Sequence, residues 1–210
     1  MDAKEKILEI IRRLRKEYPE PGTVLSFKNP FELLVATILS AQTTDVHVNR
    51  VTELLFGKYR SIKDYAEASP DELKKDLSSI NFYNNKARHI QASARAIMEN
   101  FGSQVPKTMD ELTRLPGVAR KTANIILFDA YGINEGIAVD THVRRVSARL
   151  GLTQNEDPVK IEKDLMAMTP KREWGYLSHL LIFHGRKVCK ARRPVHADCV
   201  LFNICPSRHI

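Results

Sequence analysis

Apolar side chains recur at helical spacing along almost the whole chain, and this pattern constrains the fold more than any other feature. They stand three or four positions apart, as one face of a helix requires, over residues 7–14, 87–101, 143–150 and 177–184. Residues 31–39 are apolar nearly all round, which predicts a buried central helix. Patterns typical of β-strands are scarce. We therefore expect an all-α fold of about ten helices.

Three prolines support this reading because they mark helix starts. Each follows a residue type that caps helices and precedes an apolar pattern, in the pairs Asn29–Pro30, Ser69–Pro70 and Asp157–Pro158. The chain has no repeat and no low-complexity linker. Any division into domains must therefore be compact.

The charge balance favours a polyanionic partner. The chain has 33 Lys and Arg against 25 Asp and Glu, a formal net charge of +8. Such a surplus suits nucleic acid, although some basic proteins have no such partner. No apolar run approaches the roughly 20 residues that span a bilayer. Residues 1–16 are too charged for a signal peptide.

Cysteine usage points away from a secreted protein. The three cysteines all lie in the last 22 residues, and an odd number does not suit a disulfide framework. We expect no membrane partner. We expect a cytoplasmic protein at the nucleoid, or a nuclear one in a eukaryote.

Residues 115–124 predict two helices joined by a tight turn at Gly117. The turn exposes N–H groups at the start of the second helix, where they can hold a phosphate oxygen. An ordinary helical hairpin would carry the same turn. Lys121, however, opens a helix whose next residues are expected to be buried, and there the helix dipole and any burial would favour a neutral amine. A neutral lysine is a nucleophile, so the position favours amine chemistry.

Five segments, in order, resemble the endonuclease III family of DNA glycosylases, and the likeness runs from about residue 5 to 207. Residues 115–124 resemble its helix-hairpin-helix, and Val139-Asp140-Thr141-His142-Val143 resembles its aspartate motif. The remaining three are similar to its pocket segment, its DNA-probing loop and its iron–sulfur loop, at residues 40–45, 82–87 and 184–205.

The resemblance implies a two-lobed helix-hairpin-helix DNA glycosylase fold with a C-terminal metal-cluster loop. Residues 22–133 would form a helical barrel domain that includes the hairpin. Residues 1–21 and 134–210 would form a discontinuous second domain with the cluster loop. The Lys121 and Asp140 segments would then face each other across a cleft that DNA covers.

The resemblance also implies the chemistry. The residue matching Lys121 attacks the anomeric carbon of a damaged nucleotide, the base leaves, a Schiff base forms, and β-elimination nicks the strand. Asp140 matches the catalytic carboxylate, which accepts a proton or stabilises positive charge on the sugar. Asp140 also precedes a helical pattern beginning at Thr141, so it is equally expected to cap that helix.

A flipped-out nucleotide leaves a hole in the duplex that protein side chains must fill. By resemblance, Gln42 fills the vacated site and Phe82 is a wedge between bases. Core packing is the alternative for Phe82, because only one of two neighbouring rings can easily face inward. Further DNA contacts are implied for Tyr83, Gly117, Ala119, Arg120, Lys190, Arg192 and Arg193.

Asp45 and His142 are implied to line the base pocket. Capping or a solvated surface is the alternative for Asp45, and structural hydrogen bonding is the alternative for His142. Two positions depart from the family pattern. Asn81 stands where relatives carry Gly, and Asn tolerates left-handed angles. Ala119 stands where many such hairpins have a second Gly.

The cysteine region also departs from the family. Its spacing is Cys189-x6-His196-x2-Cys199-x5-Cys205, whereas the family's [4Fe–4S] site has Cys at all four positions. We expect a cluster with Cys₃His ligation, since histidine replaces cysteine in some iron–sulfur sites. A Cys₃His zinc site and no metal are the alternatives. Lys190, Arg192 and Arg193 make the loop basic, which suits a phosphate backbone.

The sequence thus predicts a bifunctional DNA glycosylase and abasic-site lyase of base excision repair, acting as a monomer on duplex DNA. Its expected substrates are oxidised pyrimidines and abasic sites. Lys121 separates it from relatives that only excise bases. The alternatives are a thymine or uracil mismatch glycosylase, a non-catalytic DNA-binding module and a redox-sensing metalloprotein.

Overall fold

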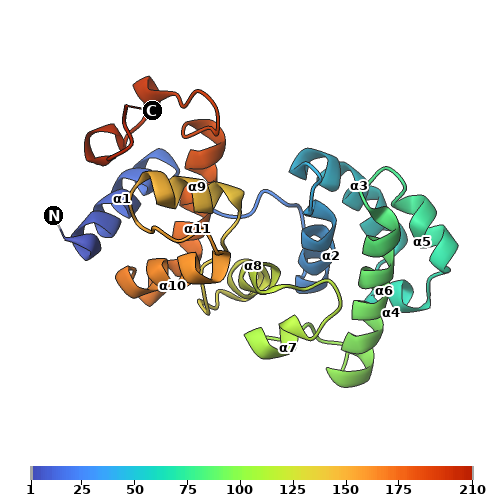
Figure 1. The fold of residues 1–210 in the computed structure, drawn as a ribbon. Coiled ribbons are helices and arrows are strands. Elements are labelled where there is room, and N and C mark those ends of the chain that lie inside the picture. The colour runs from blue at the N-terminus through green and yellow to red at the C-terminus, as the bar shows by residue number, and fades with distance from the viewer. Residues whose placement is uncertain (1, 210) are drawn as a thin grey trace. The chain divides into compact units, whose positions relative to one another are not determined.

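A computed structural model describes residues 2–209 of the chain, and these residues form eleven α-helices and three short 3₁₀ helices (Figure 1). No β-strand occurs among them, which confirms the all-α prediction. The helices are α1 (Ala3–Glu17), α2 (Pro30–Ser40), α3 (Asp45–Lys58), α4 (Ile62–Glu67), α5 (Pro70–Asp76), α6 (Tyr83–Asn100), α7 (Met109–Thr113), α8 (Arg120–Tyr131), α9 (Thr141–Arg149), α10 (Pro158–Met168), η1 (Lys171–Glu173), α11 (Trp174–Lys187), η2 (His196–Asp198) and η3 (Phe202–Ile204).

The chain divides into two compact units. Unit 1 joins Met1–Thr23 to Asn134–Ile210, and unit 2 is the continuous segment Val24–Ile133. The sequence predicts boundaries between residues 21 and 22 and between residues 133 and 134. The observed boundaries lie between residues 23 and 24 and between residues 133 and 134. Each unit encloses its own apolar core.

Helix α2 is the central helix of unit 2. Its residues 33–39 are all buried, and it packs against α3, α6 and α8. The prediction of a buried helix here is confirmed. The Asn29 side chain caps its first turn by accepting the Glu32 N–H at 2.9 Å, directly before Pro30.

The other two proline signals also mark helix starts. Asp157 accepts the N–H groups of Val159 and Lys160 at the start of α10. Ser69 is the N-cap residue of α5 and Pro70 is at its first position, as predicted, although the Ser69 side chain makes no capping hydrogen bond within the described chain. Helix α5 has only seven residues, and Leu73 anchors it to the core of unit 2.

Unit 1 is built from α1, α9, α10 and α11. Helices α9 and α11 pack closely at Gly185, where a Cβ atom would lie 3.0 Å from the Cβ of His142. A side chain at this position would require the neighbouring side chains of α9 to shift. This close packing sets the path of the chain as it leaves α11 for the cysteine region.

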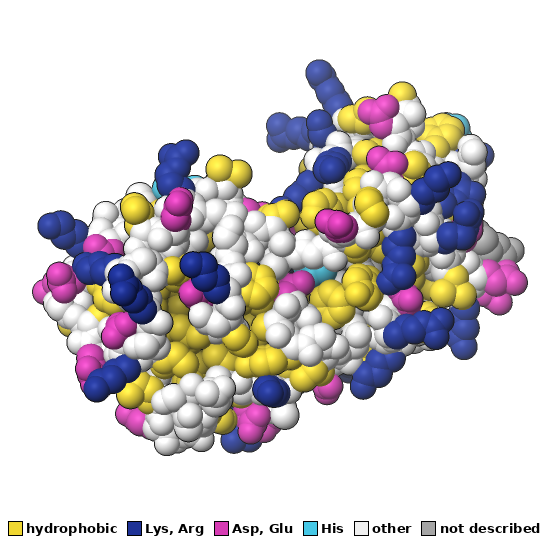
Figure 2. Space-filling view, turned by 180° about the vertical axis from the view of Figure 1, so that it is seen from behind, with side chains coloured by type: hydrophobic (Ala, Val, Ile, Leu, Met, Phe, Trp, Pro, Cys, Tyr) yellow, Lys and Arg dark blue, Asp and Glu magenta, His cyan; other side chains and the backbone are white. Residues whose placement is uncertain are grey.

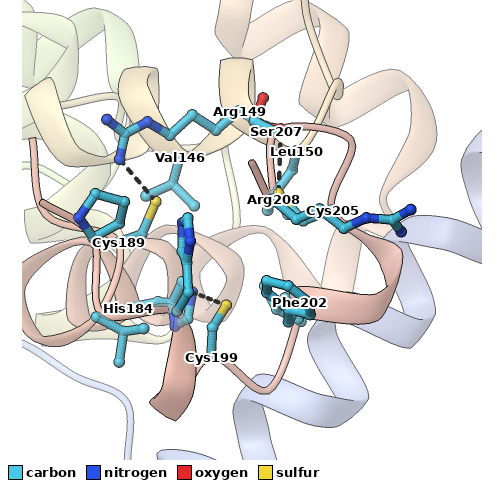
Figure 3. A pocket seen from close by; sticks show the side chains of 14 residues that line it. Val146, Arg149, Leu150, His184, Cys189, Cys199, Phe202, Cys205, Ser207 and Arg208 are labelled. Carbon is cyan, nitrogen blue, oxygen red and sulfur yellow. Dashed lines mark hydrogen bonds between the residues drawn. The ribbon is translucent and has the colours of Figure 1, made fainter. Parts of the chain in front are cut away.

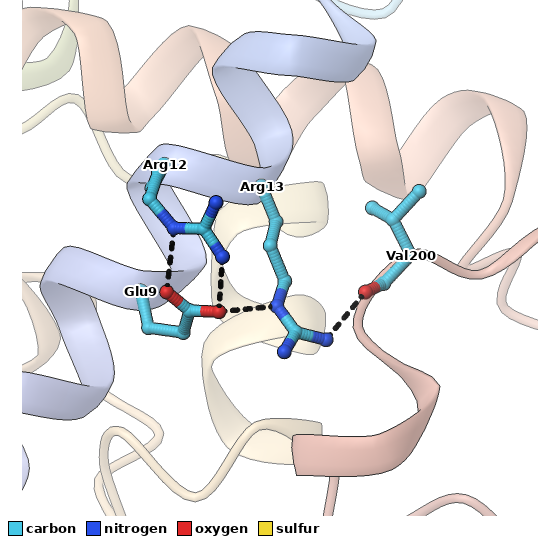
Figure 4. A network of polar contacts seen from close by, with 4 residues as sticks. All are labelled: Glu9, Arg12, Arg13 and Val200. Atoms are coloured by element: carbon cyan, nitrogen blue, oxygen red, sulfur yellow. Dashed lines mark hydrogen bonds and ion pairs between the residues drawn. The ribbon is translucent and has the colours of Figure 1, made fainter.

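An ionic network on α1 fixes the C-terminal segment of unit 1 (Figure 4). Glu9 accepts hydrogen bonds from Arg12 at 2.7 Å and from Arg13 at 2.6 Å, which lowers the pKa of Glu9 to about 2. Arg13 also donates to the Val200 carbonyl at 3.1 Å. Helix α1 thus holds the chain beside Cys199, almost at the opposite end of the sequence.

The described helices include none that is both long and apolar enough to span a bilayer.

Candidate functional site

The predicted hairpin is present in unit 2, with α7, a turn over residues 115–119, and α8. Gly117 has φ 81°, which favours glycine, and a Cβ there would lie 2.9 Å from the His89 Cβ on α6. Ser93 of α6 donates to the Pro116 carbonyl at 2.8 Å. The turn is therefore held against α6 and has little freedom to move.

The first turn of α8 is suited to an anion. Ala119 is the N-cap residue, and its methyl side chain cannot accept the N–H groups of the first turn. No acidic residue lies in that turn, and Arg120 and Lys121 add positive charge to the positive end of the helix dipole. Ala119, Arg120 and Lys121 are exposed, and so is Gly117. Backbone N–H groups and cations thus face solvent together, as phosphate binding requires.

Lys121 is the second residue of α8, as predicted. Its side chain is exposed, while Ala123 and Asn124 behind it are buried. The helix winds Lys121 outward, away from the apolar face. Its amine is accessible to a macromolecular substrate.

Gln42 and Phe82, the two expected probes of the duplex, are both exposed in unit 2. Both have left-handed backbones, with φ 56° at Gln42 and φ 58° at Phe82. Phe82 is 62% exposed, whereas Tyr83 is half-buried against the core of unit 2. Phe82 therefore does not pack in the core, and Tyr83 is the ring that turns inward.

The left-handed residue of this loop is not the one expected from the sequence. Residue type favours Asn81 for that conformation, but Phe82 has it. Asn81 instead donates its side-chain amide to the Gln42 carbonyl at 2.6 Å. The polar side chain is used to link two loops, which explains why it occurs at this turn.

Asp140 caps α9 in unit 1, as its position before Thr141 predicts. Its Oδ1 accepts the N–H groups of His142 and Val143, each at 2.8 Å. Because two short bonds hold one carboxylate oxygen, the group has a fixed orientation. Asp140 is half-buried, so the carboxylate stays at the surface of the unit.

The two predicted pocket residues have different surroundings. His142 Nδ1 lies 3.1 Å from the Arg145 guanidinium, which donates to it. Burial, joined by the charge of Arg145, lowers the pKa of His142, although the nearby Asp140 carboxylate opposes this shift. Asp45 opens α3 and is half-buried.

The four predicted metal ligands line one pocket in unit 1 (Figure 3). Cys189, Cys199, Cys205 and His196 border it together with the buried His184. Arg149 donates to the Cys189 sulfur at 3.3 Å, and His184 Nε2 lies 3.6 Å from the Cys199 sulfur. Burial raises the pKa of the Cys199 and Cys205 thiols and lowers that of His184 to about 4.

Three thiols and an imidazole around one pocket fit an iron–sulfur cluster or zinc in donor chemistry. Among residues 2–209, however, no three such side chains are already gathered at metal-binding geometry. Hydrogen bonds from α9 nevertheless hold the backbone of the cysteine loop. Arg149 donates to the Lys190 and Ala191 carbonyls, and Arg145 donates to the Cys189 carbonyl.

The basic surplus gathers in this region of the chain. Between residues 186 and 208 there are six Lys and Arg but only one acidic residue, Asp198. Figure 2 shows many Lys and Arg side chains on the face of unit 1 that is in view. Lys190, Arg192 and Arg193 are all exposed in the cysteine loop.

Several residues that build these sites were missed from the sequence. Arg145 and Arg149 are basic residues on a helix, a pattern that ordinarily indicates a solvated face. In the sequence, His184 belongs only to the apolar helical pattern of residues 177–184 and to the segment that resembles the iron–sulfur loop. Their partners lie between 15 and 44 residues away along the chain, so no local signal identifies them.

Comparisons with known proteins agree with this arrangement. Residues 35–171 match the HhH-GPD superfamily of base excision DNA repair proteins. The chain is 48% identical to an endonuclease III of Synechocystis over 97% of this chain and 93% of that protein. It is 49% identical to an endonuclease III of Bacillus subtilis over 90% and 86%. A trapped endonuclease III–DNA covalent intermediate has a TM-score of 0.93 at 44% identity, covering 99% of this chain and 98% of that chain.

The capping bonds of Asp140 make a prediction about stability. Asp140→Ala removes both acceptors and should lower the free energy of unfolding by about 1 kcal/mol. Asp140→Asn keeps an acceptor oxygen and should be nearly neutral. Urea unfolding followed by circular dichroism measures both. Equal losses in the two variants would mean that the negative charge, and not the cap, stabilises α9.

Proposed function

We propose that this chain, which belongs to the endonuclease III family of the HhH-GPD superfamily, removes oxidised pyrimidines from duplex DNA and then nicks the strand through Lys121. It is a DNA glycosylase of base excision repair. The proposal depends chiefly on one observation, an exposed lysine in the first turn of the helix that follows the Gly117 turn.

Lys121 acts as the nucleophile. After its ammonium loses a proton, the amine forms a bond to the anomeric carbon. The bond from that carbon to the base breaks with its electron pair leaving on the base, which takes up a proton. The sugar ring opens to a Schiff base with the lysine. Loss of a proton from the neighbouring carbon then expels the 3′ phosphate, which is the β-elimination that nicks the strand.

Asp140 supplies the carboxylate of the same reaction. It accepts a proton from the lysine ammonium or stabilises the positive charge that builds on the sugar as the base leaves. Its two bonds to the start of α9 support this role, because they fix the carboxylate before substrate arrives. Capping and catalysis are therefore compatible functions of one side chain.

Duplex DNA containing damaged bases or abasic sites is the partner, and solved endonuclease III structures with DNA support this. Gln42 fills the space left by the flipped nucleotide, and the exposed Phe82 ring enters between bases. Asp45 and His142 line the base pocket. Phosphates are bound by residues of both units: Tyr83, Gly117, Ala119, Arg120, Lys190, Arg192 and Arg193.

The endonuclease III family carries a [4Fe–4S] cluster. In this chain Cys189, Cys199 and Cys205 hold it, with His196 as the fourth ligand. Their shared pocket and the retained spacing support this ligand set. The cluster would order the loop that carries Lys190, Arg192 and Arg193, and it supplies no chemistry at the base.

The protein acts as a monomer in the cytoplasm, at the nucleoid. The curated relatives described above come from bacteria, which supports that location. The basic surface of unit 1 supports association with DNA there.

Borohydride trapping on a duplex with one oxidised pyrimidine tests the proposal. The reagent reduces the Schiff base, so wild-type protein should give a shifted protein–DNA band and nicked product. Lys121→Ala should give neither, because no amine remains to attack. Lys75→Ala, which removes an exposed lysine elsewhere in unit 2, is the matched control and should trap like wild type.

Retained nicking by Lys121→Ala would contradict the role of Lys121. If wild-type protein gave a trapped band on a plain abasic duplex but none on the duplex with an oxidised pyrimidine, the lyase part of the proposal would stand and its glycosylase substrate would be wrong. That result would direct the search for the substrate to mismatched thymine or uracil. No wild-type band on either duplex would leave only a DNA-binding module.

Asp140→Asn separates catalysis from capping. The neutral amide still caps α9 but cannot take up a proton or balance positive charge, so excision should fall about 100-fold or more. Affinity for an abasic analogue should change by less than about threefold, since a neutral cap costs little. Single-turnover excision and fluorescence anisotropy measure the two quantities. Equal losses in both would reduce Asp140 to a structural cap.

The proposed ligand set is tested by metal analysis of protein purified without oxygen. Iron and acid-labile sulfide should be present in equal amounts, and His196→Cys should retain both. The variant should have a lower reduction potential, because histidine ligation raises it. Stoichiometric zinc without sulfide would identify a zinc site instead. A His196→Ala variant with unchanged iron content and potential would remove His196 from the ligand set.

A further inference from the structure

Lys86 is the single buried Lys or Arg among residues 2–209, with only 6% of its surface exposed. It lies in the first turn of α6, four residues after Phe82. A buried ammonium is costly unless its protons are all bonded. A lysine that served only as positive charge for DNA would extend into solvent. Its burial therefore requires another explanation.

The ammonium of Lys86 binds the end of α2. It donates to the Leu39 carbonyl at 2.8 Å, to the Ala41 carbonyl at 2.5 Å and to the Thr43 hydroxyl at 3.3 Å. Three acceptors match its three protons. The last carbonyls of a helix lack partners within the helix and favour a cation. Helix α2 has no basic residue in its own last turn, so Lys86 supplies the missing charge.

These bonds hold the two residues that probe DNA. Gln42 lies between Ala41 and Thr43, and Phe82 directly precedes the helix that carries Lys86. Asn81 adds a second link, from its side-chain amide to the Gln42 carbonyl at 2.6 Å. Both probes have left-handed backbones, a strained conformation that persists only where surrounding contacts impose it.

We propose that Lys86 is a positioning residue, which with Asn81 holds Gln42 and Phe82 as one rigid pair so that both enter the duplex together. This rests on the DNA-probing roles proposed above for those two residues. Opening a base pair is unfavourable, and a preordered pair of probes loses little further entropy when it fills the hole. Lys86 itself makes no contact with phosphate.

The test compares abasic sites in duplex and in single-stranded DNA. Lys86→Met removes the ammonium and keeps the length of the side chain. A single strand has no stack to open and no hole to fill. The variant should therefore nick single-stranded abasic DNA at the wild-type rate, and nick duplex abasic DNA about ten- to a hundredfold more slowly. Fluorescence of 2-aminopurine placed beside the abasic site of the duplex should show that Lys86→Met flips the abasic nucleotide out more slowly than wild type does.

Salt dependence separates positioning from charge. Loss of a phosphate contact reduces the slope of log affinity against log salt by about one. Lys86→Met should leave that slope unchanged, because the buried ammonium releases no counterion. Arg88→Met is the matched control, since Arg88 is an exposed cation on the same helix. Arg88→Met should change the rate of nicking by the same factor on duplex and on single-stranded abasic DNA.

Three results would overturn the inference: unchanged duplex nicking by Lys86→Met, a reduced slope, or equal losses on the two substrates. If Lys86→Met fails to fold, Asn81→Ala is measured in its place, because it removes only the link to Gln42. A selective loss on duplex DNA by Asn81→Ala would support the inference, and equal rates on both substrates would overturn it. Wild-type protein that nicks neither substrate would refute the proposed lyase function instead.

Discussion

Unpaired peptide groups at helix ends impose the strongest physical constraint on this structure. An all-α chain of short helices leaves carbonyl and N–H groups at every terminus, and each must find a partner. Asp140 supplies the partner at the start of α9, and Lys86 supplies it at the end of α2. The start of α8 has no such side chain, because its N-cap residue is Ala119. Lys121, Asp140 and Gln42, three of the residues proposed to act on DNA, lie at or beside these helix ends, where backbone dipoles and side-chain charges combine.

The same constraint explains why some features follow from the sequence and others do not. The helices, the hairpin turn at Gly117 and the cap at Asp140 depend on neighbours within a few residues, so periodicity and residue type predict them. The bonds of Lys86 to residues 39–43 and of Arg149 to the cysteine loop span about 40 or more positions. Residue type alone predicts the left-handed conformation at Asn81, but it occurs at Phe82, because the Asn81 side chain bonds to the distant Gln42 carbonyl. Only the tertiary structure reveals that Phe82, and not Asn81, has the left-handed backbone.

The cysteine region combines both kinds of information. Its spacing predicts a set of four ligands, and the fold places all four around one pocket against the core of unit 1. What the spacing does not reveal is how the protein holds the loop. Arg145 and Arg149 bind its carbonyls from α9, the helix capped by Asp140, and Arg13 binds it from α1. The proposed cluster loop and the proposed catalytic carboxylate therefore belong to one connected set of contacts.

The proposed mechanism requires that the amine of Lys121 form a covalent bond with the damaged nucleotide. Peptide mass spectrometry of the borohydride-trapped complex, after digestion of both protein and DNA, detects that bond itself. We expect a deoxyribose-derived adduct on a single peptide, with fragmentation placing it at Lys121. An adduct on another lysine or on the N-terminal amine would contradict the mechanism, even if the trapped band itself were strong.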